Sequence, residues 1–461
     1  MANNDITFVR PEVTAASLIW KRVRDVCRGS DAVKAGGYDY LPKLDSTNNS
    51  EENQRRNEDY RKRAVFYAIT GHTLNGLIGM AFLRDPSLTL EDKMAELKSS
   101  VDGAGVSIYQ QSQATLEAVL EEARRGLYVD YSSDMQSAIV LDYQADDIIN
   151  WRTQRINGRD KLILVVLREC VEVPDGYGYK NTIQYRELSM EEGRFICRVW
   201  KNSLTTNSGP YEIASEYTPV KQFGGAWDEI PFTFVGAQNN DPDIDDSPLF
   251  ALAEINLGHY RNSADYEDSV FFCGQIQPWI SGLDQEWRDH LEKTGVALGS
   301  RSPLLLPQNG AAGFIQAEPN SLAKEAMDSK KEYMIALGAR LIEANGAVKT
   351  ATQSNGEQAA STSVLGICCS NVSEAYTQAL QWAAEYMGIQ SSTTGYRITQ
   401  EFIQRVADSG MLTAIVSAWQ SGAMRDSDMI RMMQKLDMIN PEADPEEVLD
   451  ELKNKAPNFT E

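Results

Sequence analysis

The stretch SPLFALAEINLGHYRNSADYEDSVFFCG, residues 247–274, carries the start and stop signals of one long helix. Ser247 belongs to the residue types that cap helix N-termini, and Pro248 suits the first turn, where a missing N–H costs nothing. Gly274 ends the predicted helix. From Pro248 to Cys273 the helix would extend roughly 39 Å, at about 1.5 Å per residue. We expect the rest of the chain to be arranged around this element.

A second helix is predicted over residues 320–344, NSLAKEAMDSKKEYMIALGARLIEA. Its apolar residues recur at three-, four- and seven-residue spacings, as one buried helix face requires; they are Leu322, Ala326, Tyr333, Leu337 and Leu341. The insert between the two helices, residues 274–319, combines a strand (QPWISG), a short helix (LDQEWRDHLEKTG) and two strands around a turn (SPLLLPQNGAAGFIQAE). The insert is therefore predicted to be a small α/β module.

A polar loop, NGAVKTATQSNGEQAA at residues 345–360, follows the second helix and contains no large apolar residue. Its only cation is Lys349. The loop is either an exposed connector or a mobile loop in which Lys349 meets the phosphates of a passing polymer. The order of helix, module, helix and polar loop favours an assembly architecture over a catalytic pocket.

Four cations lie on the second predicted helix: Lys324, Lys330, Lys331 and Arg340. They can form an ordinary solvated face, since Glu332 follows Lys331 directly. If copies of the chain formed a ring, the same residues would make a positive belt around its channel. The residues of the helix alone do not choose between these interpretations.

The length of 461 residues predicts two to four subdomains, and a hydrophobic fraction of 42% is enough for a real core. The net charge of −22 and a pI near 4.7 argue against a protein that coats nucleic acid by neutralising phosphates. Such a charge favours solubility, cationic partners or a surface that repels polyanions.

The six cysteines form no CxxC pair, which favours a reducing compartment. The N-terminal segment MANNDITFVRPE lacks the basic and apolar pattern of a signal peptide. No apolar run approaches the roughly 18 residues that span a bilayer, so no membrane partner is expected.

The remaining chain predicts an α+β protein. Helices are expected over residues 11–29, 51–80, 90–99, 107–125 and 361–387. Gly126 is expected to end the helix over residues 107–125. Period-two patterns between residues 127 and 235 predict a mostly antiparallel β region, with strands at LYVDYS, SAIVLDY, LILVVLREC, TIQYRELSM, RFICRVWKN and FTFVG. The acidic linker DPDIDDSP, residues 241–248, is expected to be a solvated turn, because it lacks the glycine and terminal glutamate of an EF-hand loop. A helical tail covers residues 396–461, with Asp426 or Ser427 as a cap.

Catalytic motifs are missing from the sequence. There is no GxxxxGK[ST], HExxH or GxSxG, and GAGVSI contains only half of a dinucleotide-binding GxGxxG. The three histidines, His72, His259 and His290, lie far apart within helical patterns. The sequence therefore predicts no catalytic, metal or cofactor site, although carboxylate pairs abound and sequence alone cannot select a catalytic one.

Several segments nevertheless match one family in order. They are YRKRAVFYAITGHTLNGLIGMAF, GAGVSIYQQSQATLEAVLEEARRGLYVDYS, ADDIINWRTQRINGRDKLILVVLRE, IPFTFVGAQNNDPDIDDSPLFALAEINLGHYRNSADYEDSVFFCGQIQPWISG and MIALGARLIEANGAVKTATQ. Together they resemble a divergent family of portal proteins, the head-to-tail connectors of tailed double-stranded-DNA bacteriophages. The resemblance covers about Tyr60 to Met387. Its specificity comes from the order of the matching segments along the chain, which is the order they have in the family.

The resemblance implies a non-enzymatic homo-oligomeric ring, usually a dodecamer, at one capsid vertex of the virion, assembled in the host cytoplasm. The ring would conduct DNA during packaging and ejection without sequence specificity. The implied partners are the large terminase, head–tail adaptor and tail proteins, the major capsid protein and scaffold. The implied parts are a wing (1–246), stem helices (247–273 and 320–344), a clip (274–319), a tunnel loop (345–360), a long helix (361–395) and a short helical crown (396–461).

The same resemblance points to candidate functional residues. The tunnel loop offers Lys349, Thr350, Thr352, Gln353 and Asn355, and the stem offers the four cations named above. The clip offers Trp279, Trp287, Arg288 and Arg301 as a partner interface. Two alternatives from other classes remain: an acidic cytosolic enzyme with a carboxylate-based site, and a monomeric structural or adaptor protein of a phage particle.

Overall fold

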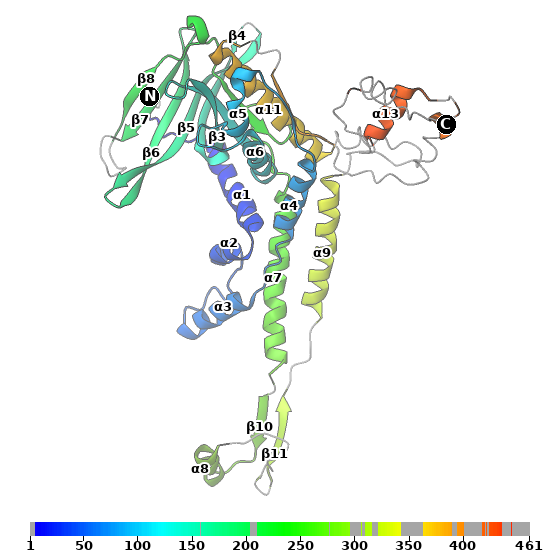
Figure 1. The fold of residues 1–461 in the computed structure, drawn as a ribbon. Coiled ribbons are helices and arrows are strands. Elements are labelled where there is room, and N and C mark those ends of the chain that lie inside the picture. The colour runs from blue at the N-terminus through cyan, green and yellow to red at the C-terminus, as the bar shows by residue number, and fades with distance from the viewer. Residues whose placement is uncertain are drawn as a thin grey trace. The chain divides into compact units, whose positions relative to one another are not determined.

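The structure is a computed structural model, and its parts are identified in Figure 1. It describes residues 5–156, 158–202, 210–275, 277–295, 306, 309–315, 321–342, 363–389, 394–400, 417–419, 421, 424–435 and 444. The chain divides into two compact units, residues 1–400 and 401–461. In the second unit, α13 (Asp426–Lys435) begins at Asp426, so Asp426 and Ser427 both lie within its first turn rather than before it. The other predicted tail helices lie outside the described residues, apart from residues 417–419.

Two antiparallel sheets make up the β region of the first unit. The order β3–β2–β9 joins β2 (Arg124–Ser132), β3 (Ser137–Gln144) and β9 (Phe232–Gly236). The order β4–β5–β6–β7–β8 joins β4 (Ile148–Ile156), β5 (Arg159–Asp175), β6 (Gly178–Glu191), β7 (Arg194–Asn202) and β8 (Tyr211–Tyr217). Strands β4 and β8 are additions to the six that the sequence predicted, and the predicted α+β class is confirmed.

Helix α11 (Val364–Met387) forms the centre of the core. Ser363 caps it by accepting a hydrogen bond from the N–H of Gly366 at 3.0 Å. It packs against β2, β9 and α6 (Ile108–Glu122), and most of its side chains are buried. A long helix so enclosed needs apolar residues on nearly every side, which explains its run of Ala, Val, Leu and Cys.

Gly126 does not end a helix, contrary to the sequence prediction. Helix α6 ends earlier, at Glu122, because Ala123 adopts the left-handed conformation with φ 57°. Gly126 lies inside β2, where a Cβ atom would stand 2.5 Å from the ring of Phe232. The glycine is needed there for close packing rather than for a helix stop.

The predicted helix over residues 51–80 is two helices, α3 (Glu51–Arg63) and α4 (Ile69–Ala81). Residues 64–68 are extended between them and alternate between buried and exposed side chains. Side chains of a distant helix hold this segment: Ser263 exchanges hydrogen bonds with the backbone of Val65, and Asn256 donates to the carbonyl of Tyr67 at 2.8 Å. These bonds replace the helical ones that the segment gives up.

The other N-terminal elements cover the same core. They are α1 (Pro11–Arg28), α2 (Ser30–Ala35), η1 (Gly37–Asp39), β1 (Ser87–Thr89), η2 (Asp92–Met94), α5 (Glu96–Ser99), η3 (Ala145–Asp147) and η4 (Gln222–Gly224). The helix predicted over 90–99 is thus broken into η2 and α5. Strand β1 pairs with β12 (Gly395–Arg397). No helix among the described residues is both long and apolar enough to cross a membrane.

Most of residues 247–274 form α7 (Phe250–Cys273), and α9 (Leu322–Arg340) lies beside it (Figure 1). Helix α7 begins later than predicted. Leu249 takes the N-cap position, and Ser247 accepts the N–H of Phe250 through its backbone carbonyl instead of capping with its side chain. Between the helices lie β10 (Gln277–Ser281), α8 (Gln285–Thr294) and β11 (Ala311–Ile315), hereafter the hairpin module. Most of the first strand predicted in SPLLLPQNGAAGFIQAE lies outside the described residues, and the second is β11.

Candidate assembly surface on the paired helices

One row of α9 faces α7. Lys330 donates a hydrogen bond from Nζ to Asn262 Oδ1 at 2.5 Å, and its stem covers Gly258, where a Cβ atom would lie 3.2 Å from Lys330 Cε. Met334 and Leu341, one and three turns further on, are 1% and 9% exposed. The two helices therefore meet along a narrow row rather than a broad core.

The predicted buried face of α9 was wrong at two positions. Leu322 and Tyr333 are 68% and 50% exposed, whereas Met334, which the prediction omitted, is buried. Leu341 was correctly placed on the buried side. An apolar residue in a helical pattern can remain exposed in the folded chain, so the pattern alone does not define the buried face.

The distal part of this region has no core of its own. Among the described residues that follow Ala264 and precede Met334, no apolar side chain is buried. Large apolar side chains are instead exposed on the end of α7, on the hairpin module and on the start of α9; they are Val270, Phe271, Phe272, Trp279, Phe314, Ile315 and Leu322. Apolar surface concentrated in this way marks an interaction site.

The hairpin module is held by local contacts. Strands β10 and β11 are antiparallel, and the indole of Trp279 covers Gly313 on the opposite strand, 3.0 Å from the position of a Cβ atom there. Asp284 caps α8 by accepting the N–H of Trp287 at 2.9 Å, and the Trp287 ring meets the His290 ring edge-on at 5.8 Å. Three of the four candidate clip residues can thus be placed.

Of these three, Trp287 is half-buried within the module, whereas Trp279 and Arg288 are exposed. Arg301 lies outside the described residues, and so do the candidate tunnel-loop residues Lys349, Thr350, Thr352, Gln353 and Asn355.

The four cations of α9 do not share a face. At about 100° per residue, Lys330 points within about 20° of the Leu341 direction, which faces α7. Lys324 and Lys331 project about 80–100° to one side of that direction, and Arg340 about 100° to the other. A single ring of positive side chains therefore does not follow from the helix geometry.

The exposed surface of α9 consists of three strips. We call the strip with Leu322, Tyr333 and Arg340 flank A, and the strip with Lys324, Lys331 and Ile335 flank B. Tyr333 and Ile335 are 50% and 61% exposed. The third strip lies opposite α7, is acidic, and contains Glu325, Asp328 and Glu332, all exposed.

The contact between the helices also involves His259 on α7. Its ring is buried and meets the Tyr67 ring edge-on at 4.9 Å. Burial lowers the pKa of His259, and the nearby charge of Lys330 lowers the pKa further. The imidazole is therefore a neutral packing group.

The paired helices are fixed to the body at both ends. Before α7, Asn371 of α11 donates to the carbonyl of Gly236 at 2.9 Å, and its own carbonyl accepts from Asn240 at 2.9 Å. After α9, the N–H of Leu365 donates to the carbonyl of Leu341 at 3.1 Å. Both anchors belong to α11, so one core helix sets the position of both members of the pair.

The acidic linker before α7 is an ordered turn. Asp241 and Asp245 accept backbone N–H groups of Asp243 and Gln238 at 2.9 and 2.7 Å. The guanidinium of Arg124 lies 4.3 Å from the ring centroids of both Trp151 and Phe234. From there it donates to the carbonyls of residues 242 and 243, each at 3.0 Å. The carboxylates of this linker thus organise backbone, as a solvated turn does.

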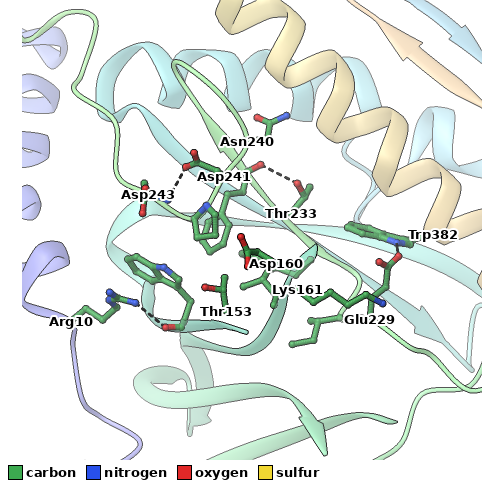
Figure 2. A pocket seen from close by; sticks show the side chains of 16 residues that line it. Arg10, Thr153, Asp160, Lys161, Glu229, Thr233, Asn240, Asp241, Asp243 and Trp382 are labelled. Atoms are coloured by element: carbon green, nitrogen blue, oxygen red, sulfur yellow. Dashed lines mark hydrogen bonds between the residues drawn. The ribbon is translucent and has the colours of Figure 1, made fainter. Parts of the chain in front are cut away.

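Figure 2 shows a cavity of about 660 Å³ beside this linker. Arg10 donates to the carbonyl of Trp151 at 2.9 Å and stacks on its indole, and Trp382 donates to Glu229 at 2.7 Å. The described lining contains no histidine, cysteine or serine. Its cations already pair with neighbouring carboxylates, Arg10 with Glu12 and Lys161 with Asp228. The carboxylates of the lining are Asp160, Glu229, Asp241 and Asp243.

Residues 248–387 match a family described as Domain of unknown function (DUF4055). Among solved structures, a chain in the neck of an empty GTA particle, computed with C6 symmetry, is 14% identical with a TM-score of 0.42, over 83% of this chain and 93% of that one. A chain in the neck of a native GTA particle, computed with C12 symmetry, is 13% identical with a TM-score of 0.40, over 79% and 89%. A chain in the virion of a native gene transfer agent (GTA) particle is 13% identical with a TM-score of 0.41, over 82% and 92%. No curated protein matches the chain.

Proposed function

We propose that this chain is a portal protein of a tailed double-stranded-DNA bacteriophage, a non-enzymatic protein whose copies form a ring at one capsid vertex. The observation that carries the proposal is the excursion from α7 through the hairpin module to α9. Beyond Ala264 this region buries no apolar side chain until Met334 among its described residues. A chain that leaves such a surface uncovered is suited to burying it against other copies.

In this proposal each part has one task. Residues 1–246 form the wing, α7 and α9 form the stem, and the hairpin module is the clip that docks first the large terminase and later the head–tail adaptor. Residues 345–360 form the tunnel loop, 361–395 the long helix above it, and 396–461 the crown. Capsid protein and scaffold surround the ring in the virion.

The charge of the chain supports a conducting role rather than a binding one. Each copy contributes a net charge of −22, so a ring of about twelve copies repels the phosphates of DNA along its inner wall. Contacts that neither hold phosphates nor reach base edges carry no sequence information. DNA would therefore pass in both directions without a preferred sequence.

The deciding experiment is the particle size of the purified protein, by light scattering after gel filtration, with negative-stain images of the same peak. Rings with a central hole are expected. A 51.3 kDa monomer that persists with capsid protein and scaffold present would reject the ring and favour a monomeric adaptor of a phage particle.

A second experiment addresses the DNA path. Deleting residues 347–358 should leave ring assembly intact and impair DNA packaging or retention. Normal packaging by the deletion variant would exclude a role of this loop in handling DNA.

A further inference from the structure

Flanks A and B of α9 lie on opposite sides of the row that faces α7. Measured around the helix axis, Tyr333 lies about 80° to one side of the Leu341 direction and Ile335 about 120° to the other. We infer that the two flanks are the two halves of one contact between neighbouring copies, with flank A of one α9 packed beside flank B of the next. This inference rests on the proposed function and names the surface through which the ring would close.

The arrangement of the strips around α9 fits a ring of side-by-side helices. In such a ring each helix needs one contact on each side, one surface turned outward and one turned inward. Helix α9 has α7 on one surface, exposed apolar residues on the two flanks, and an acidic strip opposite α7. With α7 outside, the acidic strip with Glu325, Asp328 and Glu332 lines the channel.

Several observations point to a second copy as the occupant of each flank. Tyr333 and Ile335 are large and at least half exposed; Tyr333 lies within the region that lacks its own core, and Ile335 follows the buried Met334 directly. At one height of the contact, unlike charges would also meet. Lys324 on flank B stands at the same height as Glu325, which borders flank A, so parallel neighbouring helices bring unlike charges together. Within the described residues, Lys324 and Lys331 form no ion pair of their own.

The flanks differ from each other, which makes the contact heterologous and testable by mixing. Tyr333→Asp damages flank A alone, and Ile335→Asp damages flank B alone. Each variant by itself should fail to assemble, because every contact would contain one damaged flank. The concentration needed for assembly should rise on the order of 30-fold or more for an anchor residue of an interface.

A 1:1 mixture of the two variants should restore one contact and no more. The intact flank B of Tyr333→Asp meets the intact flank A of Ile335→Asp, and the damaged flanks on the outside stop further growth. Light scattering should then report a species of twice the 51.3 kDa chain. Glu332→Ser, on the acidic strip of the same helix, is the matched control and should assemble as the unaltered protein does.

Both substituted side chains are exposed, so circular dichroism should show unchanged folding of the separate variants. If both variants form rings as readily as the unaltered chain, the flank assignment is wrong while the ring itself stands. The assignment is also wrong if the mixture contains no heterodimer. If the unaltered chain forms no ring even with capsid protein and scaffold, the proposed function fails first.

Discussion

Gly71 on α4 shows how one missing side chain sets the distance between two helices. A Cβ atom at this position would lie 2.4 Å from the backbone carbonyl oxygen of Cys27 on α1, closer than any real contact. Gly76, on the same helix, has open space around the corresponding position. Substitutions at Gly71 and Gly76 therefore distinguish the effect of close packing from the general cost of a glycine in a helix.

We expect Gly71→Ala to lower the free energy of unfolding by about 1–3 kcal/mol, because α1 and α4 must move apart. Gly76→Ala should raise it by about 0.5–1 kcal/mol through reduced freedom of the unfolded chain. Denaturant titration followed by circular dichroism measures both. Equal effects of the two substitutions would show that the approach of α4 to α1 does not depend on Gly71.

Glu121 is a second residue whose surroundings have a measurable consequence. Burial raises its pKa to about 7, the charge of Glu117 adds to the effect, and Cys27 of α1 offers a hydrogen bond that partly opposes it. A carboxyl group with a raised pKa favours folding in its neutral form. Its contribution is complete below the unfolded pKa of about 4.5 and is lost as the pH rises through 7.

Glu121→Gln, which stays neutral, should therefore remove this loss. The melting temperatures of variant and unaltered protein should be similar near pH 4.5 and diverge up to pH 8, with the variant more stable. Glu117→Gln, at an exposed neighbouring position, should reproduce only a small part of the change. Parallel pH profiles for Glu121→Gln and the unaltered protein would contradict the raised pKa.

At the scale of elements, the extended segment 64–68 depends on Asn256 of α7. This buried amide accepts the N–H of Thr70 at 3.1 Å and donates to the carbonyl of Tyr67 at 2.8 Å. Asn256→Ala should lower the free energy of unfolding by about 1–3 kcal/mol, because the buried N–H and hydroxyl groups of Thr70 lose their shared acceptor, whereas the Tyr67 carbonyl keeps the N–H of Ile69. Thermal or denaturant unfolding gives the value.

Asn262→Ala is the control for this effect on the same helix. Asn262 is half-buried and bonds to Lys330, whose ammonium group can turn to solvent instead. Its loss should cost about 1 kcal/mol or less. A similar cost for both substitutions would mean that Asn256 contributes no more than a side-chain contact.

The elements that the sequence predicted well are those that bury apolar residues in the core of their own unit. Helices α1, α7 and α11 and the strands of the β3–β2–β9 sheet have periodic apolar residues that meet the core of their own unit. The helix over 51–80 was predicted as continuous because the groups that interrupt it, Ser263 and Asn256, lie about 200 positions later in the chain. Strand β8 was missed because nearly all of its residues are exposed and show no alternation.

The candidate site was predicted in outline only. The sequence predicted two helices around a small module, and the structure has α7 and α9 around the hairpin module. The orientation of α9 was not predictable in the same way. The sequence pattern is compatible with either Tyr333 or Lys330 on the side of α9 that faces its neighbour. Only the position of α7 decides that Lys330 points toward α7 and that Tyr333 is exposed.

At the scale of the whole molecule, stability is unevenly distributed. Helix α11 is buried along most of its length, whereas the hairpin module has no buried apolar residue among its described positions. In the unassembled protein, amide hydrogens of residues 277–295 should exchange with solvent orders of magnitude faster than those of α11. Assembly should slow exchange in α9 and the hairpin module while leaving α11 unchanged. Hydrogen exchange measured by mass spectrometry on both forms would detect the difference, and identical exchange would argue against burial of this region by other copies.

The double attachment of the helix pair to α11 has a mechanical consequence. A force that pulls on the hairpin module runs up α7 to the bond between Gly236 and Asn371, and up α9 to the bond between Leu341 and Leu365. Because both paths end on the same buried helix, the two anchoring hydrogen bonds share the load and neither carries it alone. The α7–α9 pair would therefore carry tension from the hairpin module to α11 along both helices at once.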